Sequence, residues 1–187
     1  MTNQPHFFIA VPINEKMKEK LGSWLQQSQP PFQKFVHEKD FHITLAFLGG
    51  VAPKLLEQLK GGLQTVSEQH PPFSLTIQDL GFFGQKAGPR IFWAGVKHEQ
   101  KLFDLQKHIY ETCVNVGIDL EKRAYSPHIT LARKYIGDVP YNDQELKQSF
   151  FTTFKDDESW RVSSFVIYQT HLNRTPKYEV VASFQLE

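Results

Sequence analysis

The sequence predicts an α+β fold built from two similar lobes, and three observations lead to this prediction. The pentapeptide His-Ile-Thr-Leu-Ala begins at His42 and returns letter for letter at His128, 86 residues later. The run Phe7–Val11 (FFIAV) resembles Phe92–Val96 (FWAGV) at nearly the same separation. Most of the 16 phenylalanines alternate with polar residues in short runs, and this period of two is typical of half-buried strands. We therefore expect antiparallel sheets with helices packed against them.

The first half of the chain contains signals for three strands and two helices. Asn14 can cap a helix whose apolar face is Met17, Leu21, Trp24 and Leu25, and Pro53 can begin a second helix. The second apolar face is Leu56, Leu59, Leu63 and Val66. A loop is expected at Gln29–Phe32, and the glycine pair after Leu48 should end a strand. The expected strands are His6–Pro12, Phe41–Leu48 and Phe73–Ile77.

The second half repeats the order of strand, helix and pentapeptide strand. A helix over roughly Glu99–Val116 should end at Gly117, because glycine readily adopts the left-handed conformation that follows a helix. Asn142 and Glu145 have the spacing of a capping box for a short helix before Phe150. The expected strands are Arg90–Val96, Tyr125–Arg133, Val162–Thr170 and Tyr178–Leu186, the last two joined by a turn at 173–176.

The chain shows no low-complexity linker at which two domains would separate. We expect one domain over residues 1–187, made of two interleaved lobes whose repeats cover roughly 6–80 and 90–186. The two lobes should face each other across a pseudo-twofold axis, with a cleft between them. Two long repeats are too few for a solenoid.

Composition and charge limit the class of partner. The formal net charge is +1, whereas proteins that follow a long nucleic-acid backbone usually carry a basic excess. A nucleic-acid partner would therefore be held by an end or a few nucleotides. The single cysteine, the absence of a signal peptide and the absence of a long apolar run favour a location in the cytoplasm without entry into a membrane. We also expect a monomer.

The repeated His-x-Thr pair suits acid–base chemistry at phosphorus. On a strand, residues i and i+2 point to the same face, so His42 and Thr44 should project together, as should His128 and Thr130. One neutral imidazole can take a proton from water, and a second, protonated imidazole can donate a proton to a leaving oxygen. The two threonine hydroxyls can donate hydrogen bonds to the charged oxygens. Nothing in this scheme requires a metal or a cofactor.

The repeated motif has three alternative interpretations. The repeat can be a plain duplication in which the polar residues are structural. A metal site is disfavoured, because no H-x-H, H-E-x-x-H or C-x-x-C occurs and His42 and His128 would lack an obvious third ligand. A serine nucleophile is disfavoured because the sequence has no G-x-S-x-G.

The paired H-x-T-L, the opening FFIAVP, the run HITLAFLG from His42, the run RIFW from Arg90 and PHITLAR from Pro127 resemble the 2H phosphoesterase superfamily. The chain is most similar to its bacterial RNA 2′,3′-cyclic phosphodiesterases, also called 2′-5′ RNA ligases. The resemblance implies a bilobal α+β fold and metal-independent hydrolysis of a terminal 2′,3′-cyclic phosphate to a 2′-phosphate. It also implies weak, reversible 2′-5′ joining of RNA such as tRNA halves.

The same resemblance implies roles for six residues. His42 and His128 match the catalytic histidines, Thr44 and Thr130 match phosphate-contacting threonines, and Arg133 matches an arginine that assists at the phosphate. Phe47 stands five residues after His42, as Arg133 does after His128, and its position in the family lies near the base. An odd offset places both on the opposite strand face unless a bulge intervenes. The tail over 168–178 departs from the family pattern, which leaves the substrate preference open.

Two alternatives to an RNA-end phosphodiesterase remain. The first is a 2H enzyme for a small nucleotide, such as ADP-ribose cyclic phosphate or 2′-5′ oligoadenylate. The second is a non-catalytic RNA-binding module, which would not need two titrating groups. Within the mechanism we expect His128 to be the base and His42 the acid, mostly from the resemblance. The Arg133 guanidinium should also lower the pKa of His128.

Overall fold

The computed structural model describes residues 4–155 and 158–187. Nine strands form one curled, antiparallel sheet in the order β7-β4-β5-β6-β3-β1-β8-β9, and β2 pairs with β6 outside this path. The strands are β1 His6–Pro12, β2 Phe32–Phe35, β3 His42–Gly50, β4 Phe73–Gln85, β5 Gly88–Val96, β6 His128–Tyr135, β7 Ser159–Val162, β8 Ser164–Thr170 and β9 Tyr178–Gln185. The helices are α1 Glu15–Ser28, α2 Pro53–Glu68, α3 Gln100–Asn115 and α4 Gln144–Thr153, with a short 3-10 helix at Glu38–Asp40.

The strand order is symmetric about the junction between β6 and β3. β5 and β1 flank that junction, followed outwards by β4 and β8 and then by β7 and β9. Each pentapeptide strand therefore occupies an equivalent place on either side of a pseudo-twofold axis. The predicted α+β class with paired lobes is confirmed, and the two half-sheets are joined into one through the pair Ile43 and Ile129.

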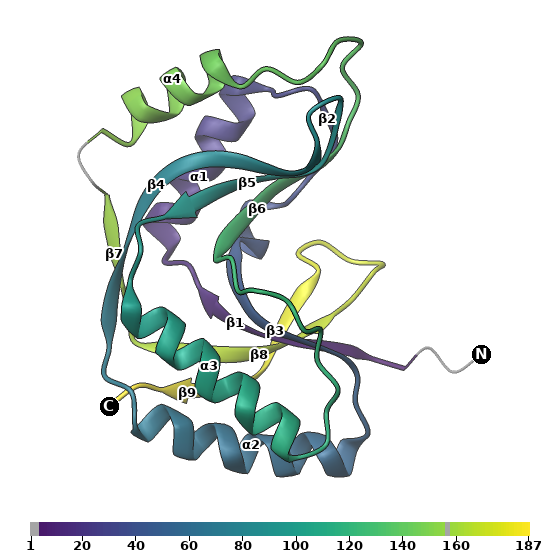
Figure 1. Ribbon diagram of the computed structural model, residues 1–187, viewed down its shortest axis with the longest axis vertical. Helices are drawn as coiled ribbons and strands as arrows, with labels where there is room; N and C mark the ends of the chain where they lie inside the picture. Colours follow the sequence, from purple (N-terminus) through teal and green to yellow (C-terminus); the bar gives the residue numbers. More distant parts are fainter. Residues whose placement is uncertain (1–3, 156–157) are drawn as a thin grey trace.

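The helices exchange between the two halves (Figure 1). Helix α1 follows β1 in sequence but packs beside α4, where the Trp24 ring meets the Phe150 ring edge-on with centroids 5.0 Å apart. Helix α3 follows β5 but packs against α2 and β3. The main core lies between these helices and the sheet, and includes fully buried Leu21, Ile43 and Ile129. The face of the sheet that carries His42 and His128 is therefore left without a covering helix.

Several local predictions hold because side-chain chemistry near each element supports them. The Asn14 side chain accepts a hydrogen bond from the Met17 amide and caps α1, and the four predicted apolar residues of that helix are buried. Pro53 begins α2, since a first-turn position needs no amide donor. Gly117 has a φ of 94°, in the left-handed region, directly after α3.

Other local predictions were wrong. The predicted loop is correct at 29–31, but its last residue, Phe32, begins strand β2, which was not predicted because it forms by pairing with β6. Strand β4 runs to Gln85, well beyond the expected end, because it pairs with β5 along that length. The cap of α4 is Asp143, and Asn142 accepts from the Gln144 amide instead of forming the predicted capping box.

Candidate active site

Strand register brings the two His-x-Thr motifs together. β3 and β6 are antiparallel and pair at Ile43 and Ile129, so His42 lies beside Thr130 and Thr44 lies beside His128. Both isoleucines are fully buried in the core, and alternate residues of a strand point to opposite faces. The imidazoles and hydroxyls therefore share the helix-free face of the sheet, at the pseudo-twofold axis. They are neighbours on one sheet rather than partners across a gap between two sheets.

A bulge in each strand returns the fifth residue after the histidine to the same face. Two consecutive residues are buried in both strands, Leu45 with Ala46 and Leu131 with Ala132. The register with β1 and with β5 shifts at these points. Phe47 and Arg133 are consequently exposed on the side of the histidines. Because both strands carry this bulge, the residue five positions after each histidine lies on the same face as that histidine.

The two ends of the site carry different groups at this position. The Phe47 side chain is 59% exposed, and its ring lies 6.0 Å from Phe8, which in turn lies 4.8 Å from the His42 ring. The Arg133 charge contributes to the lowered pKa of both His42 and His128. Within residues 4–155 and 158–187, no carboxylate forms an ion pair with Arg133. Its charge is thus available to an anion.

Each histidine is oriented by the main-chain carbonyl two residues before it. The Nδ1 atom of His42 lies 2.7 Å from the Asp40 carbonyl, and the Nδ1 atom of His128 lies 2.7 Å from the Ser126 carbonyl. A carbonyl can only accept, so Nδ1 carries the proton in both rings. The Nε2 atoms are then the reactive ones. Thr44 Oγ1 lies 3.1 Å from His42 Nε2 and donates to that nitrogen when the ring is neutral.

Burial lowers the pKa of both histidines, and that of His42 more strongly. It lowers the pKa of His42 to about 4, and the charges of His128 and Arg133 add to that decrease. Burial, with smaller contributions from Arg123 and Arg133, also lowers the pKa of His128. The expected effect of Arg133 on His128 is present, but His42 is perturbed more strongly. The pKa of His42 is lowered further because the effect of burial on its ring exceeds that of the nearby Arg133 charge.

Aromatic rings enclose His42 and were missed as site residues. Phe8 and Tyr168 belong to a small buried cluster, and half-buried Tyr178 packs against it and meets the His42 ring edge-on at 5.2 Å. Phe8 belongs to the opening motif noted in the sequence, but a strand pattern alone does not tell which ring faces the site. The tyrosines come from the tail, where the resemblance was weakest.

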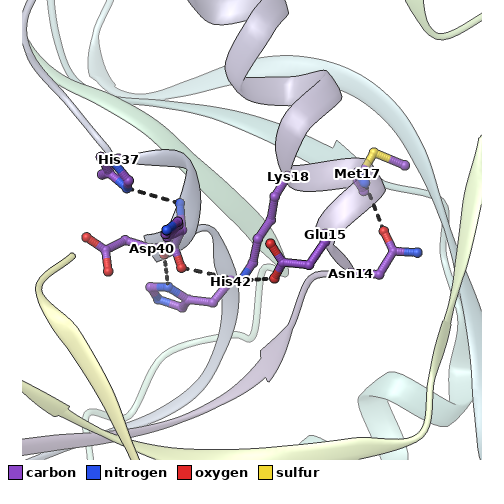
Figure 2. Close-up of polar contacts among 8 residues, drawn as sticks. Asn14, Glu15, Met17, Lys18, His37, Asp40 and His42 are labelled. Carbon is purple, nitrogen blue, oxygen red and sulfur yellow. Dashed lines mark hydrogen bonds and ion pairs between the residues drawn. The ribbon is translucent and has the colours of Figure 1, made fainter. Parts of the chain in front are cut away.

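Asp40 links His42 to the C-terminal hairpin. Its carboxylate accepts hydrogen bonds from the Lys177 amide at 2.9 Å and from the Tyr178 amide at 3.2 Å. Figure 2 shows its carbonyl bonded to the His42 ring, so one residue holds both elements. Arg174 donates to Glu179 on the same hairpin. No sequence motif marked Asp40, because its partners lie more than 130 residues away.

Potential metal ligands are not grouped around this site. In the part of the chain that the structure describes, no cluster of three or more histidine, cysteine, aspartate or glutamate side chains could hold a metal ion. In the same residues, no helix is long and apolar enough to cross a membrane.

Comparison with known proteins agrees with this arrangement. A family model described as the 2′-5′ RNA ligase superfamily matches residues 7–174. The chain belongs to the 2′-5′ RNA ligase superfamily. The family predicted from the H-x-T motifs is thereby confirmed.

Two relatives of this superfamily carry the same name. An RNA 2′,3′-cyclic phosphodiesterase of Geobacillus stearothermophilus is 40% identical over 97% of the chain, which spans 57% of that relative. One of Bacillus subtilis is 34% identical, with 98% of the chain and 97% of the relative covered. The chain thus spans little more than half of the first relative and nearly all of the second.

Solved structures support the fold of this superfamily member. The crystal structure of Escherichia coli LigT complexed with 3′-AMP has a TM-score of 0.79 at 24% identity, covering 98% of this chain and 99% of LigT. TT0787 of Thermus thermophilus has a TM-score of 0.77 at 22% identity, with 97% of each chain covered. At these identities the likeness establishes the fold alone.

Proposed function

We propose that this protein hydrolyses the terminal 2′,3′-cyclic phosphate of RNA to a 2′-phosphate, using His42 and His128 as its acid–base pair. One observation carries this proposal: the two H-x-T motifs lie side by side with both Nδ1 atoms bonded to carbonyls. Two Nε2 atoms and two hydroxyls then face one small volume. The names of the Geobacillus and Bacillus relatives favour RNA over a small nucleotide.

The reaction needs one proton removed and one supplied. A neutral imidazole takes a proton from water as the water oxygen bonds to phosphorus. The bond from phosphorus to the ribose 3′-oxygen breaks, and the second imidazole, initially protonated, gives its proton to that oxygen. Thr44 and Thr130 donate to the non-bridging oxygens, and the Arg133 charge offsets the growing negative charge. The product is a 2′-phosphate, and no step requires a metal or a cofactor.

The family resemblance favours His128 as the base and His42 as the acid in this scheme. Burial, with the charges of Arg123 and Arg133, lowers the pKa of His128 and keeps that ring neutral near pH 7. Burial also lowers the pKa of His42, but Asp40 opposes this decrease. A bound anionic phosphate raises the pKa of His42 further, so that this ring can carry the proton for the leaving oxygen.

The same proposal includes the substrate, the oligomeric state and the cellular compartment of the protein. The near-neutral net charge suits a monomer that binds an RNA end, such as the end of a tRNA half. In the reverse direction, reaction of the cyclic phosphate with a 5′-hydroxyl would form a 2′-5′ linkage. Cys113 is the single cysteine and is buried, which fits a reducing cytoplasm.

The test is to incubate the protein and EDTA with an oligonucleotide that ends in a 2′,3′-cyclic phosphate. The expected product is the 2′-phosphate isomer, identified by chromatography and by its resistance to a 3′-specific phosphatase. Activity that EDTA abolishes and zinc or manganese restores would overturn the mechanism. Binding without turnover would favour an RNA-binding module, and faster turnover of ADP-ribose cyclic phosphate or 2′-5′ oligoadenylate would favour a small-nucleotide enzyme.

A further inference from the structure

A second pair of aromatic rings lies beside His128 and has no part in the proton transfers. The Phe83 ring meets the His128 ring edge-on, with centroids 4.8 Å apart, and the Trp93 ring lies 6.2 Å from it. The two aromatic rings are 5.4 Å apart. Both side chains are only half-buried, on strands β4 and β5. Together, Phe83 and Trp93 form an aromatic surface beside His128.

Glycines let the Trp93 indole lie against the sheet. Gly81 is directly opposite Trp93 in the β4–β5 register, and a Cβ at Gly81 would overlap the indole. A Cβ at Gly95 would come within 3.2 Å of the same ring and 2.7 Å of an Asp79 oxygen. The indole therefore covers the backbone of β4. It lies on the same face of the sheet as the His128 ring, because Trp93 pairs with Thr130 in the β5–β6 register.

The equivalent ring in the other half of the molecule is covered by two tyrosines. By the internal repeat, Phe8 on β1 corresponds to Trp93 on β5. Phe8 is buried, because Tyr168 stands opposite it in the β1–β8 register and Tyr178 packs edge-on against it. Gly81 occupies on β4 the place that Tyr168 occupies on β8. The pseudo-symmetric positions thus differ: Tyr168 and Tyr178 cover the Phe8 ring, whereas the Trp93 indole lies over Gly81 and is itself only half-buried.

A phosphodiester between the two histidines carries a nucleoside on each side of its phosphorus atom. Under the proposed function the acid His42 lies beside the leaving 3′-oxygen, so the nucleoside bearing the 2′,3′ oxygens lies at the His42 end, where Phe47 is exposed. We propose that Trp93 and Phe83 form a second stacking subsite, for the base of the nucleoside joined through its 5′-oxygen in a 2′-5′ phosphodiester. This inference rests on the proposed function, because that function places the phosphorus between the histidines.

Stacking explains how a protein with little net charge can hold such a ligand. A base stacked on an aromatic side chain gains roughly 5- to 100-fold in affinity, and every base offers the same flat face. The subsite would therefore accept any base. It would favour compounds with two nucleosides over a mononucleotide cyclic phosphate.

Binding of an unreactive dinucleotide tests the subsite. The probe is 3′-deoxyadenylyl-(2′→5′)-adenosine, whose missing 3′-hydroxyl prevents expulsion of the second nucleoside by cyclisation. Its partner compound lacks the base of the second nucleoside. We expect the complete dinucleotide to bind roughly 5- to 100-fold more tightly and to quench tryptophan fluorescence. The quench should be lost in Trp93→Phe, and the affinity difference between the two compounds should be lost in Trp93→Leu.

Trp160→Phe is the matched control, since Trp160 is a buried tryptophan on β7. It should retain both the quench and the affinity difference. Equal affinity of the two compounds for the unmodified protein would overturn the subsite, and this comparison depends on no variant. The assigned occupant would be wrong if the quench followed a nucleotide added on the 5′ side of adenosine 2′-phosphate.

Hydrolysis of adenosine 2′,3′-cyclic phosphate separates this inference from the proposed function. That substrate has one base, so its turnover does not involve the second subsite. Turnover without a contribution from the second base would refute the subsite and leave the function intact. Loss of turnover with an intact base contribution would refute the function alone.

Discussion

Each reactive histidine in this protein is prepared by its own strand. The carbonyl two residues earlier fixes the proton on Nδ1, and the hydroxyl two residues later lies on the same face. A short segment therefore supplies an orienting carbonyl, a fixed tautomer and a hydroxyl on one face. Two such copies lie side by side, and under the proposed function they act as an acid and a base.

Loss of either imidazole should be severe. We expect His42→Ala and His128→Ala each to lower kcat by about two to four orders of magnitude, with a small change in KM, because each ring moves a proton in the transition state. His6→Ala, on exposed His6 at the start of β1, is the control and should retain normal kinetics. Near-normal kcat in either active-site variant would remove that histidine from the mechanism.

The phosphate-contacting groups should have smaller effects. Thr44→Val and Thr130→Val should each cost about 1–3 kcal/mol of transition-state stabilisation, because an anion loses one donor. Arg133→Lys should also lower kcat/KM, since a point charge cannot copy the two-pronged contact of a guanidinium. Exposed Thr65 and Arg161, away from the site, give the controls Thr65→Val and Arg161→Lys. If the active-site and control variants behave alike in steady-state assays, these side chains are structural.

The division of labour between the histidines can be measured with a better leaving group. If His42 is the acid, a p-nitrophenyl phosphodiester should restore much of the lost rate in His42→Ala, because its leaving oxygen needs little protonation. His128→Ala should remain slow on the same substrate. The reverse pattern would make His128 the acid, and equal rescue would leave no division of roles.

At the scale of elements, the C-terminal hairpin completes the environment of His42. Tyr178 reaches the His42 ring from β9, and the Asp40 carboxylate holds the chain just before and at the start of that strand. Asp40 also raises the pKa of His42 and so opposes the larger effect of burial. Asp40 thus orients the His42 ring through its carbonyl and raises the pKa of that ring through its charge.

Asp40→Asn should weaken this link in two measurable ways. The free energy of unfolding should fall by about 1–3 kcal/mol, because charge-assisted hydrogen bonds to two amides are weakened. The pKa of His42, followed by NMR titration, should fall below its value of about 4, because a favourable negative charge is lost. Asp138→Asn, on an exposed aspartate, should change neither quantity. An unchanged His42 titration in Asp40→Asn would show that Asp40 acts only through structure.

At the scale of the whole molecule, burial of the neutral His42 ring should make the stability of the fold depend on pH. The pKa of His42 is about 4 in the folded protein, below the usual 6.5. The unfolded chain therefore binds a proton first as the pH falls. The stabilisation is fully present above pH 6.5 and is lost progressively down to about pH 4.

Comparison with His42→Gln isolates this contribution. Between pH 6.5 and 4, the unmodified protein should lose up to about 3 kcal/mol more stability than the variant, as measured by denaturant unfolding at each pH. Other titrating groups, including His70, are common to both proteins and cancel in the difference. Identical pH profiles would mean that the His42 pKa is not lowered in the folded state.

The features that the sequence predicted correctly are those encoded by neighbouring residues. Apolar spacing marked α1, α2 and α3, and alternation marked most strands, because helix and strand periods follow from backbone stereochemistry. The repeated pentapeptide at His42 and His128 indicated a paired site and the family. These signals require no knowledge of which segments meet.

The remaining features depend on contacts between distant segments. Pairing with β6 made a strand of β2, and two bulges turned Phe47 and Arg133 towards the histidines. Burial among rings from β1, β8 and β9 lowered the pKa of His42 more than that of His128, which no local pattern indicates. Register and desolvation are properties of the packed chain. They appear only when strands far apart in the sequence lie side by side.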